Sequence, residues 1–136
     1  MKRVAWVALA GCGGVEQGYE PVPPLDEEAF VESVGPVLEE RCANPSCHGR
    51  PERPLAVYAP RRFRADATRT FLDEPLTSEE LRHNYDRACG FAAFVDAPIE
   101  SLLLRKPLGR AYHGGGIVLA EGDAETRVIE DWLWSE

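Results

Sequence analysis

Apolar residues recur at three- and four-residue intervals near the start of the folded part of the chain, which predicts a helix. Asp26 can cap this helix, and Glu27 and Glu28 in its first turn suit the helix dipole. The apolar face that follows consists of Phe30, Val34, Val37 and Leu38. Pro36 lies within this stretch, so we expect it either to kink the helix or to begin a second one at its first position.

Three further stretches predict helices. Residues 77–80 (Thr-Ser-Glu-Glu) have the form of a capping box, and the helix after it would bury Leu81, Tyr85 and Ala88. Residues 99–104 form a short apolar helix that ends before Pro107, and Asp123 can cap a last helix. The buried stripe of that last helix would be Val128, Ile129, Trp132 and Leu133.

No segment alternates clearly between apolar and polar residues, although residues 55–58 could form a short extended piece. The pattern therefore predicts a mainly α fold in which several short helices are joined by long loops.

Composition restricts the class of protein. With 136 residues the chain has the length of one domain, and its 44% hydrophobic content is that of an ordinary globular protein. The 15 Lys and Arg against 23 Asp and Glu give a formal net charge of −8. This acidic balance argues against nucleic-acid binding, which shows as a basic patch or stripe.

The first residues have the pattern of an export signal. Lys2 and Arg3 precede a short apolar run, and the following Leu9-Ala10-Gly11-Cys12 resembles the lipobox of bacterial lipoproteins. The resemblance implies that residues 1–11 are a signal peptide and that Cys12 is lipidated. The protein would then be exported and lipid-anchored at the periplasmic or cell-surface face of a bacterial membrane. The alternative is an ordinary secretory signal that happens to contain a cysteine.

Residues 12–25 are rich in Gly and Pro and lack an apolar period, so we expect a flexible tether there. Residues 26–136 would form the folded domain.

The stretch from Cys42 to His48 (Cys-Ala-Asn-Pro-Ser-Cys-His) is the most informative about chemistry. A Cys-His pair that closes a short cysteine loop is the arrangement of c-type haem attachment. In that chemistry Cys42 and Cys47 would form thioethers with the haem, and His48 would be the proximal iron ligand. The usual spacer between the cysteines has two residues, and here it has four. The turn-forming pair Asn44-Pro45 would let this longer loop bulge.

From this point the chain resembles small bacterial c-type cytochromes over roughly residues 26–134. The matching segments, in order, are Val34-Gly35-Pro36, the cysteine-histidine motif, residues 101–107 (Ser-Leu-Leu-Leu-Arg-Lys-Pro), residues 113–116 (His-Gly-Gly-Gly) and Trp132. The resemblance implies a cytochrome c-like fold around a single covalent haem c with its iron. It also implies an electron carrier rather than an enzyme, with a redox partner protein that the sequence does not name.

The resemblance also places a histidine on the other side of the haem, at His113. The only methionine is Met1, which leaves with the signal peptide, so methionine ligation is excluded in the mature chain. His83 lies about 200° round its helix from the apolar face, and we expect it to be exposed. His113 is therefore the candidate sixth ligand, and the alternative is a turn residue in a glycine-rich loop. Bis-histidine ligation would give a comparatively low reduction potential.

Two alternatives remain open for the function. Cys89 could pair with Cys42 or Cys47 in a haem-free, disulfide-stapled interaction domain, or it could be a small buried apolar residue. Cys42, Cys47 and two histidines could instead bind zinc in a small metal-binding module. The arginines at 61, 62 and 64 form either a solvated face or a set of partners for haem propionates.

Overall fold

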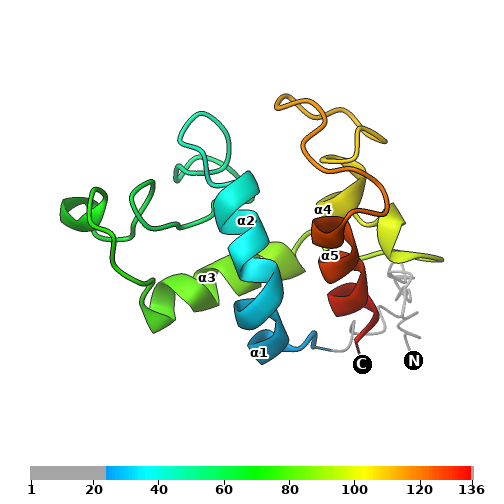
Figure 1. The fold of residues 1–136 in the computed structure, drawn as a ribbon, viewed down its shortest axis with the longest axis horizontal. Coiled ribbons are helices and arrows are strands. Elements are labelled where there is room, and N and C mark those ends of the chain that lie inside the picture. Colours follow the sequence, from blue (N-terminus) through cyan, green and yellow to red (C-terminus); the bar gives the residue numbers. More distant parts are fainter. Residues whose placement is uncertain (1–23, 136) are drawn as a thin grey trace, which may run out of the picture.

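The computed structural model describes residues 24–135. The predicted signal peptide, the lipidated Cys12 and most of the predicted tether lie outside the described residues, so the lipid anchor and the exported location stay predictions. Figure 1 shows short helices joined by long loops. The elements are α1 (Glu27–Ala29), the π-turn η1 (Phe30–Val34), α2 (Gly35–Arg41), η2 (Ala67–Arg69), α3 (Ser78–Cys89), η3 (Pro98–Glu100), α4 (Leu102–Arg105) and α5 (Ala124–Trp134). Residues 24–135 contain no strand, only an isolated bridge between Ala59 and Phe63, so the mainly α prediction is confirmed.

α1, η1 and α2 form one continuous helix with a π-turn in its middle. Pro36 has no N–H to donate, and its ring collides with the carbonyl four residues earlier in a regular helix. Just before Pro36 the helix takes up one extra residue per turn, as a π-helix does. The Gly35 N–H therefore bonds to the carbonyl of Phe30, five residues earlier. The helix therefore passes through the proline without ending, and Phe30, Val34 and Leu38 all remain buried.

The predicted helix starts are confirmed at three positions. The Asp26 and Asp123 side chains accept from the backbone N–H groups of Ala29 and Thr126. Thr77 and Glu80 form the complete capping box of α3. Each carboxylate or hydroxyl satisfies a donor that the helix itself leaves unpaired.

The helix predicted for residues 99–104 is divided in two. Pro98 begins the 3-10 turn η3, and Ser101 then adopts an extended ψ of 147°. The Ser101 carbonyl accepts from the N–H groups of Leu104 and Arg105, which starts α4 as a separate turn. The apolar spacing alone does not reveal this break.

Three aromatic rings hold the helices together. The ring of Phe30 lies 5.7 Å from that of Tyr85 and 5.2 Å from that of Trp132, so η1, α3 and α5 meet at one point. The polar tips of the other two rings are also bonded. The Tyr85 hydroxyl donates to the carbonyl of Leu25, and Trp132 Nε1 donates to that of Asp26. These two bonds tie the segment just before α1 to α3 and α5.

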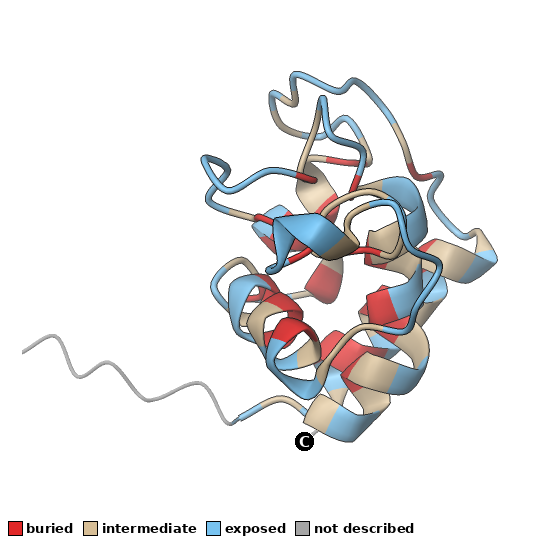
Figure 2. Ribbon diagram, turned by 90° about the vertical axis from the view of Figure 1, so that its left-hand side faces the viewer, coloured by how far each residue is buried: buried red, intermediate tan, exposed pale blue. Residues whose placement is uncertain are grey.

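Figure 2 shows the buried residues on the inward faces of the helices, whereas the loops above them are mostly exposed. The loop that follows α2 and the loop between α4 and α5 rise from the same end of this helical base (Figure 1). Within residues 24–135, no helix has the length and apolar character needed to cross a membrane.

Candidate functional site

A cavity of about 670 Å³ lies between the loop after α2 and the segment from α4 to Gly115. This volume is in the range of ordinary cofactor and ligand sites. Its walls are mostly apolar and come from α2, α4, α5 and the loops beside them: Val37, Leu38, Leu55, Phe91, Leu102, Leu103, Leu119 and Ile129. The polar residues lining it include Cys42, Cys47, His48 and His113. All four haem-site residues predicted from the sequence therefore line one cavity.

The cysteine loop is compact despite its four-residue spacer. The Asn44 side chain accepts from the backbone N–H of Ser46, and the Asn44 carbonyl accepts from that of Cys47 at 2.8 Å. The loop ends at Gly49, whose backbone lies close to that of Ala43. A Cβ at this position would lie only 2.3 Å from the carbonyl oxygen of Ala43, so no larger residue fits there without backbone movement. The predicted turn at Asn44-Pro45 thus brings Cys42 and Cys47 to the same cavity.

His48 is held by contacts to three parts of the chain. Its backbone N–H donates to the Cys42 carbonyl, and its own carbonyl accepts from Val57. Its Nδ1 lies 2.8 Å from the Leu55 carbonyl oxygen. Because a carbonyl only accepts, Nδ1 holds the proton and Nε2 keeps a free lone pair. Burial lowers the pKa of His48 and so favours the neutral ring, although the hydrogen bond to the Leu55 carbonyl opposes this effect.

His113 makes the same kind of contact. Its Nδ1 lies 2.7 Å from the carbonyl oxygen of Gly116 and donates to it, and its Nε2 has no hydrogen bond among residues 24–135. Gly116 has a φ of +73°, a left-handed conformation that glycine adopts without strain, and this turn brings its carbonyl back to the imidazole.

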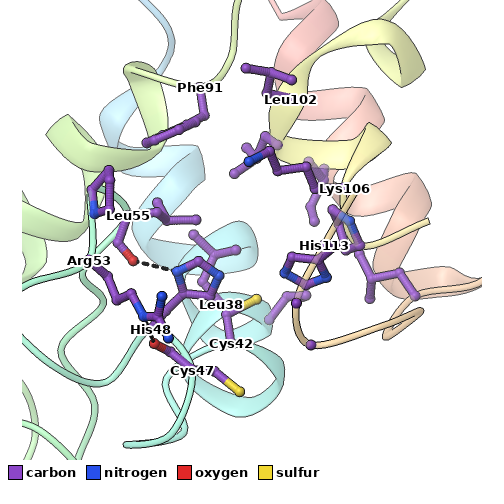
Figure 3. Close-up of a pocket in the computed structure, with 18 of the residues that line it drawn as sticks. Leu38, Cys42, Cys47, His48, Arg53, Leu55, Phe91, Leu102, Lys106 and His113 are labelled. Carbon is purple, nitrogen blue, oxygen red and sulfur yellow. Dashed lines mark hydrogen bonds between the residues drawn. The ribbon is translucent and has the colours of Figure 1, made fainter. Parts of the chain in front are cut away.

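The two imidazoles lie across the cavity from each other (Figure 3). Their ring centres are 6.0 Å apart and their planes differ by 16°. An imidazole nitrogen binds a first-row metal at about 2 Å and lies roughly 1 Å from its own ring centre. Two imidazoles on opposite sides of one metal ion therefore have centres about 6 Å apart. The distance between the ring centres of His48 and His113 matches this spacing.

The cavity is cationic although the chain is acidic. None of the residues that line it within the described part of the chain is an Asp or Glu, whereas Arg53 and Lys106 both line it. Neither cation belongs to an ion pair among residues 24–135. Arg53 Nε donates to the Cys47 carbonyl, which places its guanidinium beside the cysteine loop. Such a lining suits a ligand that is largely apolar but bears negative groups.

The arginines considered as propionate partners lie elsewhere. Arg64 is buried and paired with Glu80, Arg61 pairs with Asp73, and Arg62 donates to backbone carbonyls at the end of α2. None of the three lines the cavity. Their positions therefore give no support to the propionate alternative, and the solvated-face alternative holds for the exposed Arg61 but not for the buried Arg64.

His83 is half-buried rather than exposed. Its Nε2 bonds to the Ala56 carbonyl at 3.1 Å, and its ring lies 4.6 Å from that of Tyr58. The irregular segment at residues 56–58 passes over this face of α3, which the position of His83 on the helix could not indicate. His83 does not line the cavity, which agrees with the choice of His113 rather than His83 as the candidate sixth ligand.

The three cysteines of the described chain are free thiols. Burial raises the pKa of Cys42 to about 12, and burial also raises the pKa of Cys89. Cys89 lies at the end of α3 beside Tyr85 and does not line the cavity. The structure thus contains neither disulfide that the haem-free alternative needs.

Sequence reasoning missed Arg53 and the Leu55 carbonyl. Both lie in an irregular segment where no periodicity marks which side chains face inward, so only the three-dimensional fold identifies them.

Neither family models, curated proteins nor solved structures give a match to this sequence. Within residues 24–135, no three His, Cys, Asp or Glu side chains come together as a metal-ligand cluster, so the zinc alternative lacks a preformed ligand set there. The function has to be inferred from the cavity itself.

Proposed function

We propose that residues 26–136 form a cytochrome c-like domain that binds one haem c and transfers electrons in an exported, lipid-anchored protein. The observation that best supports this is the His48–His113 pair. Two imidazoles whose Nδ1 atoms are bonded to backbone carbonyls have ring centres 6.0 Å apart in one largely apolar cavity, which is the spacing that two axial ligands of one iron would need.

The other lining residues fit the remaining parts of a haem. Cys42 and Cys47 lie beside His48 and would form the thioethers, while Arg53 and Lys106 would pair with the two propionates. The apolar walls would cover the porphyrin and exclude water. When bound, the haem supplies one-electron exchange at its iron, and the protein supplies burial, ligands and charge.

The cationic lining also favours haem over zinc. A divalent cation in this cavity would face Arg53 and Lys106 with no carboxylate nearby. An amphiphilic dianion would gain from the same two charges. The bis-histidine ligation would give a comparatively low potential, since it lacks the thioether ligand that raises potentials in methionine-histidine cytochromes.

The test is to export the protein from a host with haem-maturation machinery. We expect a Soret band that survives denaturation, because thioethers are covalent, and a haem-linked peptide that contains residues 42–48. The Cys42→Ser/Cys47→Ser double variant should lose the denaturation-resistant band. The Cys89→Ser variant is the matched control and should keep it, because Cys89 does not line the cavity.

A colourless product would contradict the proposal. A colourless protein with a disulfide from Cys89 to Cys42 or Cys47 would support the stapled interaction domain instead. A colourless protein with stoichiometric zinc would support the metal-binding module.

A further inference from the structure

The two imidazoles that face each other are held in different ways. His48 is bonded through its N–H, carbonyl and Nδ1 to Cys42, Val57 and Leu55. The adjacent Gly49 packs so tightly on Ala43 that a Cβ would collide with it. Moving His48 away from the cavity would break several contacts at once.

His113 is held only within its own loop. Its Nδ1 bonds to the Gly116 carbonyl, and the Gly116 N–H bonds back to the His113 carbonyl at 2.9 Å. Among residues 24–135, no hydrogen bond joins residues 112–117 to any other segment, and the nearest anchors are Ala111 to Arg105 and Val118 to Pro107. The imidazole and its partner carbonyl can therefore move together without breaking the Nδ1 bond.

The loop also has a glycine, Gly114, at a position where a larger residue would fit. A Cβ at Gly114 would meet no atom within 4 Å, and its φ lies outside the left-handed region. Neither space nor conformation requires glycine there. Its neighbours Tyr112 and Ile117 are 92% and 73% exposed, and the Ile117 side chain packs over Gly109, where a Cβ would lie 2.7 Å from its Cγ1. Low contact density of this kind is typical of segments that open locally.

We propose, on the basis of the haem function above, that His113 is a displaceable ligand and that the ferrous domain binds a small neutral ligand such as carbon monoxide in its place. If haem occupies the cavity, the iron–Nε2 bond to His113 would be exchanged for an iron–carbon bond. Nε2 would keep its electron pair, so the step would transfer no electron. His48 would stay bound throughout.

The lining of the cavity does not oppose entry of such a ligand. Most of it is apolar, and Figure 3 shows Phe91 and Leu102 to one side of the two imidazoles. An uncharged diatomic molecule gains no benefit from water or charge, so it loses little on entering such a cavity.

The test is rapid mixing of the reduced holoprotein with carbon monoxide. If His113 must leave first, the observed rate rises with carbon monoxide and then reaches a plateau set by the release of His113. The His113→Ala variant should bind at a rate proportional to concentration, with no plateau. A plateau that persists in this variant would show that another group is displaced and would overturn the proposal.

Two glycine variants should move the plateau in opposite directions. Gly114→Ala restricts the loop without a clash, and we expect the plateau to fall roughly two- to fivefold. A Cβ at Gly115 would lie 3.3 Å from Cε1 of His113, so Gly115→Ala crowds the ring and should raise the plateau. Gly90→Ala, at the end of α3, is the matched control and should leave it unchanged.

The outcomes separate this inference from the proposed function. A low-spin haem that binds no carbon monoxide in the native protein, while His113→Ala binds it at once, would overturn displacement and leave the haem function standing. The same plateau in all glycine variants would also overturn it. Absence of haem from every variant would overturn the proposed function and this inference with it.

Discussion

At the scale of single residues, the buried pair of Arg64 and Glu80 determines how the long segment after the cavity is held. The two side chains are 0% and 2% exposed. Arg64 also donates to the carbonyls of Glu74 and Pro75, and Glu80 accepts from the N–H groups of Ala65 and Thr77. Glu80 is thus both the capping-box residue of α3 and the anchor of residues 64–77, which the sequence motif alone does not show.

We expect Glu80→Gln to destabilise the domain by about 3–5 kcal/mol at neutral pH, because it leaves the Arg64 charge buried without a partner. The free energy of unfolding can be measured by urea denaturation. Glu79→Gln, the exposed neighbour on the same helix turn, is the control and should change it by less than about 0.5 kcal/mol. Equal effects of the two substitutions would show that the buried pair is not important for stability.

The same pair makes stability depend on pH. Burial opposes ionisation of Glu80, but the bonds from Arg64, Thr77 and Ala65 outweigh it and lower its pKa to about 2 from 4.5. The unfolded chain therefore binds this proton first, so the stabilisation is complete above pH 4.5 and is lost as pH falls towards 2. Glu80→Gln should flatten the acid limb of the stability curve over this window. An unchanged acid limb would contradict the assignment.

At the scale of elements, α5 depends on its cap. Asp123 accepts from the Thr126 N–H at 2.8 Å and from the Ala120 N–H at 3.1 Å. It therefore ties the loop that contains Leu119 to the helix that contains Ile129, and both residues line the cavity.

We expect Asp123→Ala to cost about 1 kcal/mol of stability and to lower the melting temperature by about 4–8 °C. Differential scanning calorimetry measures both. Asp131→Ala removes an exposed carboxylate from the same helix without removing a cap, so it should change the melting temperature little. A smaller effect for Asp123→Ala than for this control would mean that the cap does not limit stability.

Helix starts could be predicted from sequence because caps are local. Asp26, the Thr77 box and Asp123 each act within four residues of themselves. The break at Ser101 and the orientation of His83 could not be predicted, because each depends on a distant segment. Just after the break at Ser101, the Leu103 N–H donates to the Phe91 carbonyl at the end of α3. The His83 ring bonds to the carbonyl of Ala56.

At the scale of the whole molecule, charge is separated by location. The chain holds eight more acids than cations, yet the cavity lining contains cations and histidines and no carboxylate. The sequence predicted the cysteines and both histidines of this site, because motif and resemblance concern exactly these residue types. It could not predict the full charge of the lining, since Arg53 becomes a neighbour of the site only through the fold.

This charge separation leads to a prediction about what the cavity recognises. In the Cys42→Ser/Cys47→Ser background, binding is non-covalent, so the affinities for haemin and for its dimethyl ester can be compared by Soret titration. The ester keeps the ring and iron but lacks the two negative charges. If Arg53 and Lys106 pair with the propionates, haemin should bind roughly tenfold or more tightly than the ester, since hydrogen bonds to charged groups contribute about 1.5–3 kcal/mol.

Arg53→Gln and Lys106→Gln should each reduce this preference for haemin over its ester, and the two substitutions together should abolish it. Arg105→Gln is the control, because Arg105 lies next to Lys106 in sequence but faces Glu100 and does not line the cavity. A preference that survives both substitutions would mean that other groups hold the propionates.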